Sequence, residues 1–457
     1  MLRHAIPCFL LAGALGSMGC SSAGAEASRA RAASTEHAIA ITHVTLIDPA
    51  SGPRPDVTIV MVGHRITAVG PSASTPVPEH AQVHDETGHF AVPGFWDAHV
   101  HLTQMGMDSM PLFVANGVTS VRDMGSTFGD IVLWKQAWST GQPAPRVFAP
   151  GPKIDGKGEL WGDNWLVTTP DGARRAVDDL AAYGVDFIKV HAGLSRPVYD
   201  ALADESRKKG LSFAGHVDED YPAAWAAKSG QRTIEHGSSM VPCSDTVRAQ
   251  LRADPKLVPL LKWVCASSND DVMPELARAG AWLTPTLVSW RGKTMLLKEA
   301  PSLEGYRYVS AALEKRWLGD GEETAPQPIE REVLAQFGPL AANAHRAGVH
   351  LLVGTDIGDP YVVPGFGLHD EMQLFVEAGI PPLVALRSAT LEAARALGAD
   401  ATTGSIEVGK SADVVLLDAD PLANIRNTRR IGAVVQNGRW FDRAALTALL
   451  EPLTRRK

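Results

Sequence analysis

Residues 92–102 have the sequence Val-Pro-Gly-Phe-Trp-Asp-Ala-His-Val-His-Leu, and the rest of the chain is organised around this stretch. Apolar and polar side chains alternate after Pro93-Gly94, which predicts a β-strand that begins at a turn. Because side chains at i and i+2 of a strand point the same way, His99 and His101 share one face. Two imidazoles in this arrangement can bind one metal ion. Two core histidines held by hydrogen bonds explain the same pattern, so the rest of the chain must decide.

Length and charge indicate a large globular protein and give no sign of a charged macromolecular partner. At 457 residues the chain is too long for one simple core, so a large domain and a smaller one are expected. The formal net charge of −8 gives no reason to expect nucleic acid or anionic lipid as a partner.

The first 36 residues predict an export signal and a tether. Residues 1–20 combine a charged start with an apolar run too short to span a bilayer, and they end at Cys20. This segment resembles a bacterial lipoprotein signal, in which Cys20 is the lipidated first residue of the mature protein. Because Ser17 stands where such signals usually have Leu, ordinary signal-peptidase cleavage stays open. Residues 21–36 predict a disordered tether.

This start predicts a location as well. The protein is expected to be exported in a bacterium, either as a periplasmic protein or as a membrane-anchored lipoprotein. Contact with the membrane is expected only through the N-terminal lipid anchor.

Two cysteines, Cys243 and Cys265, remain in the predicted globular part. In an oxidising compartment these two thiols can form a disulfide. Two unpaired buried cysteines explain the sequence equally well, because the spacing does not give their separation in space.

The two ends of the chain predict parts of one β domain. Residues 37–92 contain short strand-like runs separated by turn residues. The same pattern returns in residues 401–445, where Asn437-Gly438 is a hairpin signal. We therefore expect a small composite β-sandwich domain formed by both chain ends.

Between these ends, residues 93–400 alternate strand and helix patterns, which is typical of a parallel sheet or barrel. Eight strands are predicted, at residues 95–102, 118–124, 145–150, 185–191, 211–217, 232–236, 281–288 and 349–355. Eight strands within about 300 residues match a (β/α)8 TIM barrel with insertions. The expected fold class is therefore α/β, a TIM barrel that carries the composite β domain.

Polar side chains stand at the carboxyl ends of the predicted barrel strands. They are His99, His101, Lys189, His216, His236 and Asp356. Barrels of this kind build their active sites at that end. Each residue alone has a structural explanation, such as a core histidine, an ion-paired lysine or a helix cap. Their joint placement on one rim is hard to obtain from packing, and it favours a metal site.

The residue types on this rim predict two metal ions and hydrolysis. Four imidazoles and a carboxylate exceed what one tetrahedral ion needs. A lysine amine is a poor ligand, but CO2 can add to a buried Lys189 and give a carbamate that bridges two metals. The two metals would share a hydroxide that forms at neutral pH and attacks a polarised carbonyl. Asp356 and His236 are the predicted catalytic residues, with Asp356 as general acid and base.

The ordered motifs resemble those of the amidohydrolase superfamily. They are the run at residues 93–101, Ile188-Lys189-Val190, Gly215-His216, Ile234-Glu235-His236-Gly237 and Gly354-Thr355-Asp356. The resemblance covers residues 37–445 and is nearest to exported, binuclear prolidase-like and Xaa-Arg/Lys-dipeptidase-like members. The ligand sets that it implies are His99, His101 and Asp356 for one metal, His216 and His236 for the other, and carboxylated Lys189 as the bridge. The expected metal is Zn2+.

The resemblance also implies a substrate class. We expect a prolidase- or carboxypeptidase-like hydrolase that cleaves the amide bond of dipeptides or N-acyl amino acids through the metal-bridging hydroxide. A cyclic-amide or lactone hydrolase, or a deaminase, on the same barrel is the first alternative. A non-catalytic surface-binding protein is the second, and the intact ligand set argues against it. Homo-oligomers are common for this architecture, and nothing in the sequence fixes a subunit number.

Residues outside the ligand set are predicted to contact substrate. They are Tyr221, Arg291, His369, Trp161 and His191. Trp161 lies with Asn164 and Trp165 in a loop where that branch often carries Gly-Gly-His. Each has a structural alternative, such as a packed loop, a surface tyrosine or a helix-terminal histidine.

Overall fold

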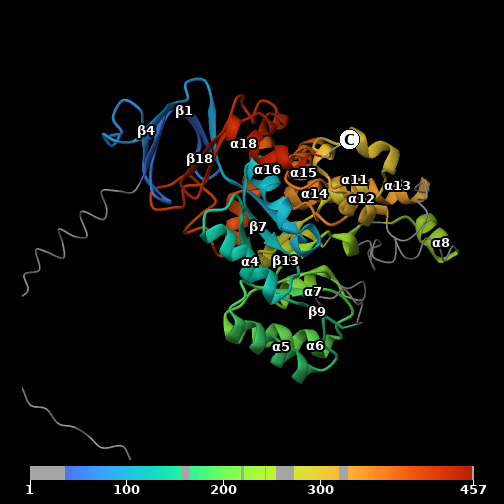
Figure 1. Ribbon diagram of the computed structural model, residues 1–457. Helices are drawn as coiled ribbons and strands as arrows, with labels where there is room; N and C mark the ends of the chain where they lie inside the picture. Colours follow the sequence, from blue (N-terminus) through green and yellow to red (C-terminus); the bar gives the residue numbers. More distant parts are fainter. Residues whose placement is uncertain are drawn as a thin grey trace, which may run out of the picture. The chain divides into compact units, whose positions relative to one another are not determined.

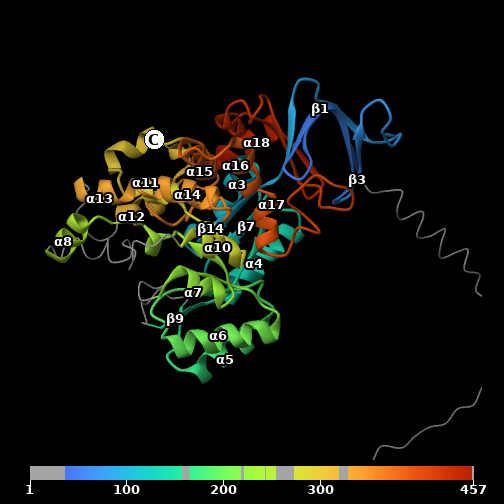
Figure 2. The same ribbon diagram turned by 180° about the vertical axis from the view of Figure 1, so that it is seen from behind.

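The computed structural model describes residues 37–156, 164–217, 221–241, 243–253, 272–318 and 328–454 (Figures 1 and 2). Residues Ala38–Lys457 form one compact unit. The predicted signal peptide with Cys20, the tether, Trp161 and Cys265 lie outside the described residues. Within the described ranges, no helix has the length and apolar character needed to cross a membrane. Cys243 is disulfide-bonded.

One eight-stranded sheet contains strands from both ends of the chain, drawn in blue and red in Figure 1. Its strands are β1 (Ala38–Asp48), β2 (Gly52–Val62), β3 (Arg65–Pro71), β4 (Gln82–Asp85), β5 (Phe90–Pro93), β16 (Val414–Leu417), β17 (Ile431–Gln436) and β18 (Arg439–Asp442). The two ends join where β5 pairs antiparallel with β16. The backbone N–H of Ile66 also donates to the carbonyl of Lys410 (2.9 Å). The edge strand β3 is therefore tied to the segment before β16, and the sheet curls around its own core.

Strand β16 connects this sheet to the barrel through the alternation of its side chains. All four of its residues are buried. Val414 and Leu416 belong to the core of the curled sheet, whereas Val415 and Leu417 belong to the core of the barrel. Because successive strand residues point to opposite faces, one uninterrupted apolar run fills two cores.

The middle of the chain forms the predicted (β/α)8 barrel. Its strands are β6 (Phe95–Val100), β7 (Val118–Asp123), β8 (Arg146–Phe148), β9 (Lys153–Asp155), β11 (Ile188–Val190), β12 (Phe213–Gly215), β13 (Gln231–Glu235), β14 (Trp282–Thr284) and β15 (His350–Leu351). Neighbouring strands pair in parallel. The backbone N–H of Ala98 donates to the carbonyl of Val353 (2.9 Å), which joins the last strand position to the first.

Two strands, β8 and β9, together occupy the third position of the barrel. The prediction for residues 145–150 covers β8 and stops before β9. Between the two strands Gly151 adopts a positive φ of 73°, and Pro152 has no N–H to donate, so the strand is interrupted there. The short strand β10 (Asn164–Leu166) extends the sheet beside β9.

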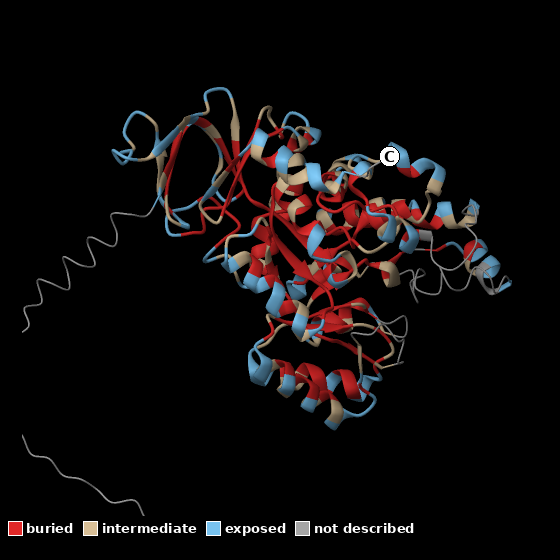
Figure 3. Cartoon of the chain, in the orientation of Figure 1, coloured by how far each residue is buried: buried red, intermediate tan, exposed pale blue. Residues whose placement is uncertain are grey.

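Helices follow the barrel strands, and they present mixed buried and exposed faces around the buried strands (Figure 3). The α-helices are α2 (Leu102–Met105), α3 (Met110–Ala115), α4 (Phe128–Ser139), α5 (Pro170–Tyr183), α6 (Arg196–Lys209), α7 (Ala223–Lys228), α8 (Asp245–Ala253), α10 (Met273–Ala279), α11 (Leu287–Gly292), α12 (Ala311–Leu318), α13 (Pro328–Leu334), α14 (Phe337–Arg346), α15 (Phe366–Glu377), α16 (Pro382–Ser388), α17 (Leu391–Ala396) and α18 (Arg443–Leu450). Short 3-10 helices are η2 (Met107–Ser109), η3 (Ser238–Met240), η4 (Leu297–Ser302), η5 (Tyr306–Tyr308), η6 (Ile425–Arg429) and η7 (Glu451–Leu453).

Helix α6 shows the local signals that set such elements. Pro197 stands in its first turn, where a missing N–H costs nothing. Gly210 ends the helix in the left-handed conformation, with φ 68°.

Candidate metal centre

The carboxyl end of the barrel holds the six predicted ligands. They are His99 in β6 and His101 just after it, Lys189 in β11, His216 after β12, His236 after β13, and Asp356 after β15. The backbone N–H of Asp356 donates to the carbonyl of His99 (2.7 Å). Because the strands are parallel, their carboxyl ends meet on one rim.

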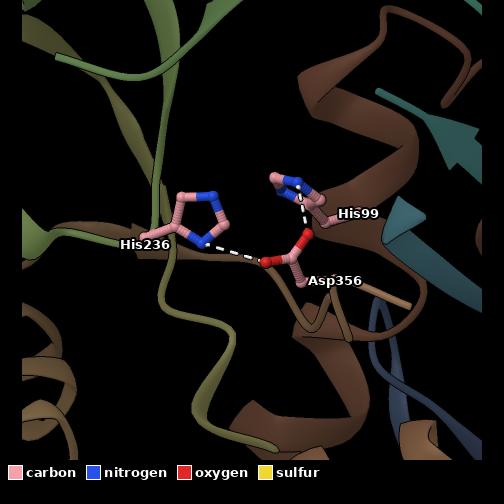
Figure 4. A group of neighbouring side chains, drawn as sticks. All are labelled: His99, His236 and Asp356. Atoms are coloured by element: carbon pink, nitrogen blue, oxygen red, sulfur yellow. Dashed lines mark ion pairs between the residues drawn. The ribbon is translucent and has the colours of Figure 1, made fainter. Parts of the chain in front are cut away.

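Asp356 is the centre of this group. Its Oδ1 lies 3.3 Å from Nε2 of His99 and 3.3 Å from Nε2 of His101. Its Oδ2 lies 3.7 Å from Nδ1 of His236, whose Nε2 is 3.1 Å from Nε2 of His216. One ligand atom each of His99, His236 and Asp356 lies within 4.8 Å of the others, and the carboxylate stands between the two imidazoles (Figure 4). Imidazole nitrogens and carboxylate oxygens this close together can act as ligands of a metal ion.

The backbone at this rim is strained. His236 and Asp356 have positive φ angles of 65° and 57°, and Thr286, whose hydroxyl lies 2.8 Å from Nδ1 of His236, has φ 50°. Each such conformation costs on the order of 1–3 kcal/mol in a residue other than glycine. Such strain is typical of functional sites.

Lys189 is the least satisfied side chain of the group. It is fully buried, and its Nζ has no hydrogen-bond partner among the described residues. Its strand neighbours Ile188 and Val190 belong to the apolar core. Burial lowers the pKa of Lys189 to about 7. A large fraction of the amine is therefore uncharged near neutral pH.

Most of the imidazoles are neutral at pH 7. Burial holds the pKa of His216 and His236 well below the usual value and lowers the pKa of His101 to about 4. Burial alone would raise the pKa of Asp356, but His99 and His236 hold it well below its usual value. Neutral imidazole and ionised carboxylate are the forms that bind metals.

His99 differs from the other imidazoles. Burial would lower its pKa, yet Asp356 and Glu235 raise it. Its Nε2 is buried and, within the described ranges, has no hydrogen-bond partner. A metal ion at Nε2 would replace a proton that faces the Asp356 carboxylate 3.3 Å away. The donor set therefore fits a divalent metal.

His191 stands beside the ligands. Its Nδ1 lies 2.6 Å from Oδ2 of Asp155, which is completely buried at the end of β9. The ring centroids of His191 and His216 are 4.7 Å apart. His191 therefore lies at the rim, as its place in the sequence suggested. Because Nδ1 contacts Asp155, Nε2 is the nitrogen that faces away from this carboxylate.

Tyr221 lies close to this corner of the rim. Its hydroxyl donates to the carbonyl of Leu194 (2.9 Å). Together with His191 and His216 it lines a small cavity. The predicted role of Tyr221 in substrate binding stays a prediction.

The structure does not support a substrate contact for His369. This side chain is 1% exposed, with Nδ1 3.0 Å from the Thr428 hydroxyl and Nε2 3.2 Å from the carbonyl of Asn116. Its ring packs edge-on against Phe95, at the start of β6 and at the opposite end from the metal ligands. His369 is a packing residue, and the sequence pattern misled because buried and functional histidines look alike.

In the described part of the chain, the contacts of Arg291 do not include any of the six predicted ligands. Its guanidinium pairs with Asp370. It lines a groove of about 400 Å³ between α11, α13, α14 and α15, and none of the six predicted ligands lines that groove. The predicted contact between Arg291 and a substrate carboxylate is not supported by this position.

Sequence reasoning missed the polar groups behind and beside the ligands. Arg122 and Glu235 are buried and bonded to each other, and Glu235 also reaches His99. Lys153 and Asp155, on the unpredicted strand β9, are likewise buried. Only Glu235 had a signal in the sequence, as the residue before His236 in an apolar strand.

A barrel with a candidate metal site and a second sheet built from both chain ends is typical of metal-dependent hydrolases. Comparison with known proteins identifies the family. The model of the amidohydrolase family matches residues 90–441. The chain belongs to the amidohydrolase family. Members of this family are metal-dependent hydrolases that act on C–N bonds.

Curated relatives are distant. The chain is 24% identical over 392 residues to imidazolonepropionase of Caulobacter vibrioides, covering 81% of this chain and 89% of that protein. It is 23% identical over 389 residues to adenine deaminase 2 of Jannaschia sp., covering 83% of this chain and 52% of that protein. The chain thus spans about half the length of the deaminase.

Solved structures support the prolidase-like branch of the family. A Bifidobacterium longum protein assigned as a prolidase is 28% identical, with a TM-score of 0.67 and coverage of 91% of this chain and 99% of that chain. Bottromycin amidohydrolase, at 24% identity, has a TM-score of 0.72 and coverage of 93% and 91%. A Xaa-Pro dipeptidase with bound methionine has 21% identity, a TM-score of 0.66 and coverage of 89% and 100%. The last two, below 25% identity, show the shared fold.

Proposed function

We propose that this protein is a two-metal amide hydrolase that removes the C-terminal residue from dipeptides or N-acyl amino acids. The observation that carries the proposal is the buried amine of Lys189, which has no hydrogen-bond partner among the described residues and lies on the rim that carries four imidazoles and Asp356. A single metal would not need this lysine. The similarity to the Bifidobacterium prolidase adds support for the substrate class.

The rim geometry supports the ligand sets that we propose for the two metals. Asp356 reaches both His99 and His101 at 3.3 Å, and these three would hold one ion. His216 and His236, whose Nε2 atoms are 3.1 Å apart, would hold the other. When bound, two divalent ions, which we expect to be Zn2+, lower the pKa of water and polarise the scissile carbonyl.

Lys189 would join the two ligand sets after carboxylation. Its Nζ forms a bond to the carbon of CO2 and loses a proton, so that a neutral amine becomes an anionic carbamate. The carbamate supplies two oxygens where the amine has no partner. The apolar neighbours Ile188 and Val190 keep bulk water away from this bond.

Asp356 is placed to move the proton. Its Oδ2 accepts a weak hydrogen bond from the Ser289 hydroxyl at 3.4 Å. We assign to it the general acid and base: it takes a proton from the attacking water and returns it to the nitrogen of the leaving amine. His236, 3.7 Å from the same oxygen, is the second catalytic residue that we propose.

The substrate would lie over the rim beside His191. Asp155 holds Nδ1 of this imidazole, so its Nε2 is available to a substrate polar group. Tyr221 lines the same corner. We propose both as substrate contacts.

Hydrolysis of a cyclic amide is the second candidate function. It is favoured by the similarity to imidazolonepropionase, which extends over 81% of this chain. The adenine deaminase similarity points to deamination in the same way. Deamination leaves the buried Lys189 amine without a role, whereas a cyclic-amide hydrolase would use the same bridge. We place both second because the Bifidobacterium prolidase, at 28% identity, favours a linear amide substrate.

A substrate panel separates these candidates. Protein without residues 1–20 is assayed on Xaa-Pro, Xaa-Lys/Arg and N-acyl-phenylalanine substrates, and on imidazolone propionate and adenine. Turnover of one amide group and of neither ring compound is the expected result. Turnover of only the ring compounds would contradict the proposal. We also propose that residues 1–20 direct export, which secretion of the full chain with cleavage before Cys20 would test.

A further inference from the structure

Arg122 is an arginine enclosed by the barrel. It lies on β7, and its side chain is 1% exposed. Its Nε donates to the carbonyl of Ala98 on β6 (2.5 Å), and one terminal nitrogen donates to the Thr233 hydroxyl on β13 (2.7 Å). The other terminal nitrogen donates to both carboxylate oxygens of Glu235, at 2.9 Å each. The planar guanidinium therefore ties three barrel strands together.

Glu235 connects Arg122 to His99, one of the proposed metal ligands. Its side chain is completely buried, and its Oε2 lies 2.8 Å from Nδ1 of His99. The Thr233 hydroxyl donates to its other oxygen. The ion pair with Arg122 makes Glu235 a hydrogen-bond acceptor, and it faces Nδ1 of His99, which therefore donates its N–H.

This contact decides which nitrogen of His99 can bind. With Nδ1–H donated to Glu235, only Nε2 remains, and it points to Asp356 at 3.3 Å. A ligating histidine that donates its other N–H to a carboxylate is fixed in tautomer and orientation. Here a second layer, Arg122, fixes the carboxylate in turn.

A purely structural ion pair is the competing explanation. Buried ion pairs contribute little net stability, because desolvation of both charges offsets their attraction. What distinguishes this pair is its contact with His99. Nδ1 of His99 lies against the Glu235 carboxylate, and both side chains are completely buried.

We infer that Arg122 and Glu235 are positioning residues that fix the tautomer and orientation of His99 and thereby set the affinity of the centre for its metal. The inference rests on the proposed metal site. It assigns a function to two residues that touch neither substrate nor metal.

The test measures metal binding rather than turnover. Metal-stripped protein is titrated with Zn2+ against a chelator, and the visible spectrum of the Co2+-loaded protein reports the ligand geometry. Glu235→Gln keeps the shape of the side chain but removes its charge. Arg122→Lys keeps the positive charge but removes the planar guanidinium with its several donors. Its Zn2+ affinity tests the inference if Glu235→Gln does not fold. Tyr199→Phe is the matched control, because it deletes a buried hydrogen bond (2.6 Å) to Gln231 at the other end of β13.

A 10- to 100-fold loss of Zn2+ affinity and an altered Co2+ spectrum are expected in Glu235→Gln, with a smaller loss in Arg122→Lys. Tyr199→Phe should retain wild-type affinity. If the variants change only the unfolding of metal-free protein and bind Zn2+ as wild type does, the pair is structural and the inference is wrong. If wild type itself binds no metal, the proposed function fails instead.

Discussion

The two ends of the barrel treat a buried histidine in opposite ways. At the amino end, His369 has both ring nitrogens bonded, to Thr428 and to the carbonyl of Asn116. At the carboxyl end, His99 donates one nitrogen to Glu235 and leaves the other without a hydrogen bond within the described ranges. Burial alone therefore does not mark a functional histidine. A buried ring nitrogen without a hydrogen bond, at a rim with strained backbone, is a better mark of a functional histidine. Leaving such an atom unbonded costs free energy that a bound ligand can offset.

The largest effect is expected at the carboxyl end, from Asp356→Asn. The amide keeps an oxygen ligand but cannot take up a proton, so kcat should fall about 10²- to 10⁴-fold. Metal content, measured by elemental analysis, should stay near the wild-type value. Asp370→Asn is the control, since this carboxylate pairs with Arg291 outside the rim. Retained turnover in Asp356→Asn would refute the acid and base role.

Matched glutamine substitutions compare the two ends directly. His99→Gln should lose Zn2+ affinity by on the order of 100-fold, because a ligand and its carboxylate contact are both removed. His369→Gln should keep the metal and lower the free energy of unfolding by about 1–3 kcal/mol, since it disturbs satisfied buried hydrogen bonds. Chelator competition and urea unfolding give the two values. Loss of metal in His369→Gln would erase the contrast between the ends.

A smaller effect is expected for His191→Asn. Removing the imidazole beside His216 takes away the proposed substrate contact, and a single hydrogen bond is worth about tenfold in KM. Steady-state kinetics on the best dipeptide substrate measures this, with metal content unchanged. His350→Asn serves as control, because that histidine pairs with Glu392 away from the rim. An unchanged KM would remove His191 from the substrate site.

The last prediction concerns stability rather than activity, and it is about Glu371, a buried carboxyl near the N-terminus of α11. Burial raises its pKa to about 8, although the backbone N–H groups of Val288 (2.6 Å) and Leu287 (2.9 Å) oppose this. Asp97 adds to the rise and Arg291 opposes it. The folded protein thus binds a proton that the unfolded chain releases near its ordinary pKa of 4.5.

Stability should therefore fall as pH rises from about 4.5 to about 8, by up to about 1.4 kcal/mol per unit from this group. Glu371→Gln, which does not titrate, should lack that part of the slope in urea unfolding across the same range. Identical slopes in the variant and the wild type would show that Glu371 is ionised in the folded protein.

Much of the fold could be predicted from local pattern. Each predicted barrel strand overlaps an observed one, because buried parallel strands are short apolar runs bounded by turns. The miss at β9 has a local cause, the Gly151-Pro152 interruption. Predicting the curled sheet required knowing that β5 pairs with β16, although these strands lie more than 300 positions apart. Only the similar strand patterns at the two chain ends suggested this pairing.

The site divides in the same manner. The placement of the six proposed ligands on one rim could be predicted, because strand ends in a barrel converge there and position in sequence gives position in space. The partnership of Arg122 and Glu235 could not, since they are 113 positions apart and their register depends on the barrel closing. The sequence did not reveal that His369 packs against Phe95 or that Arg291 pairs with Asp370, because such partners depend on how distant elements pack together.

Metal stoichiometry tests the central claim most directly. Purified protein without its first 20 residues is reconstituted with Zn2+ and bicarbonate, and bound metal is counted beside Lys189→Ala with and without acetate. Two ions per wild-type chain, fewer in Lys189→Ala, and recovery with acetate are the results that this account predicts. One ion or none in the wild type after reconstitution would contradict the bridging role of Lys189 and move the single-metal reactions ahead.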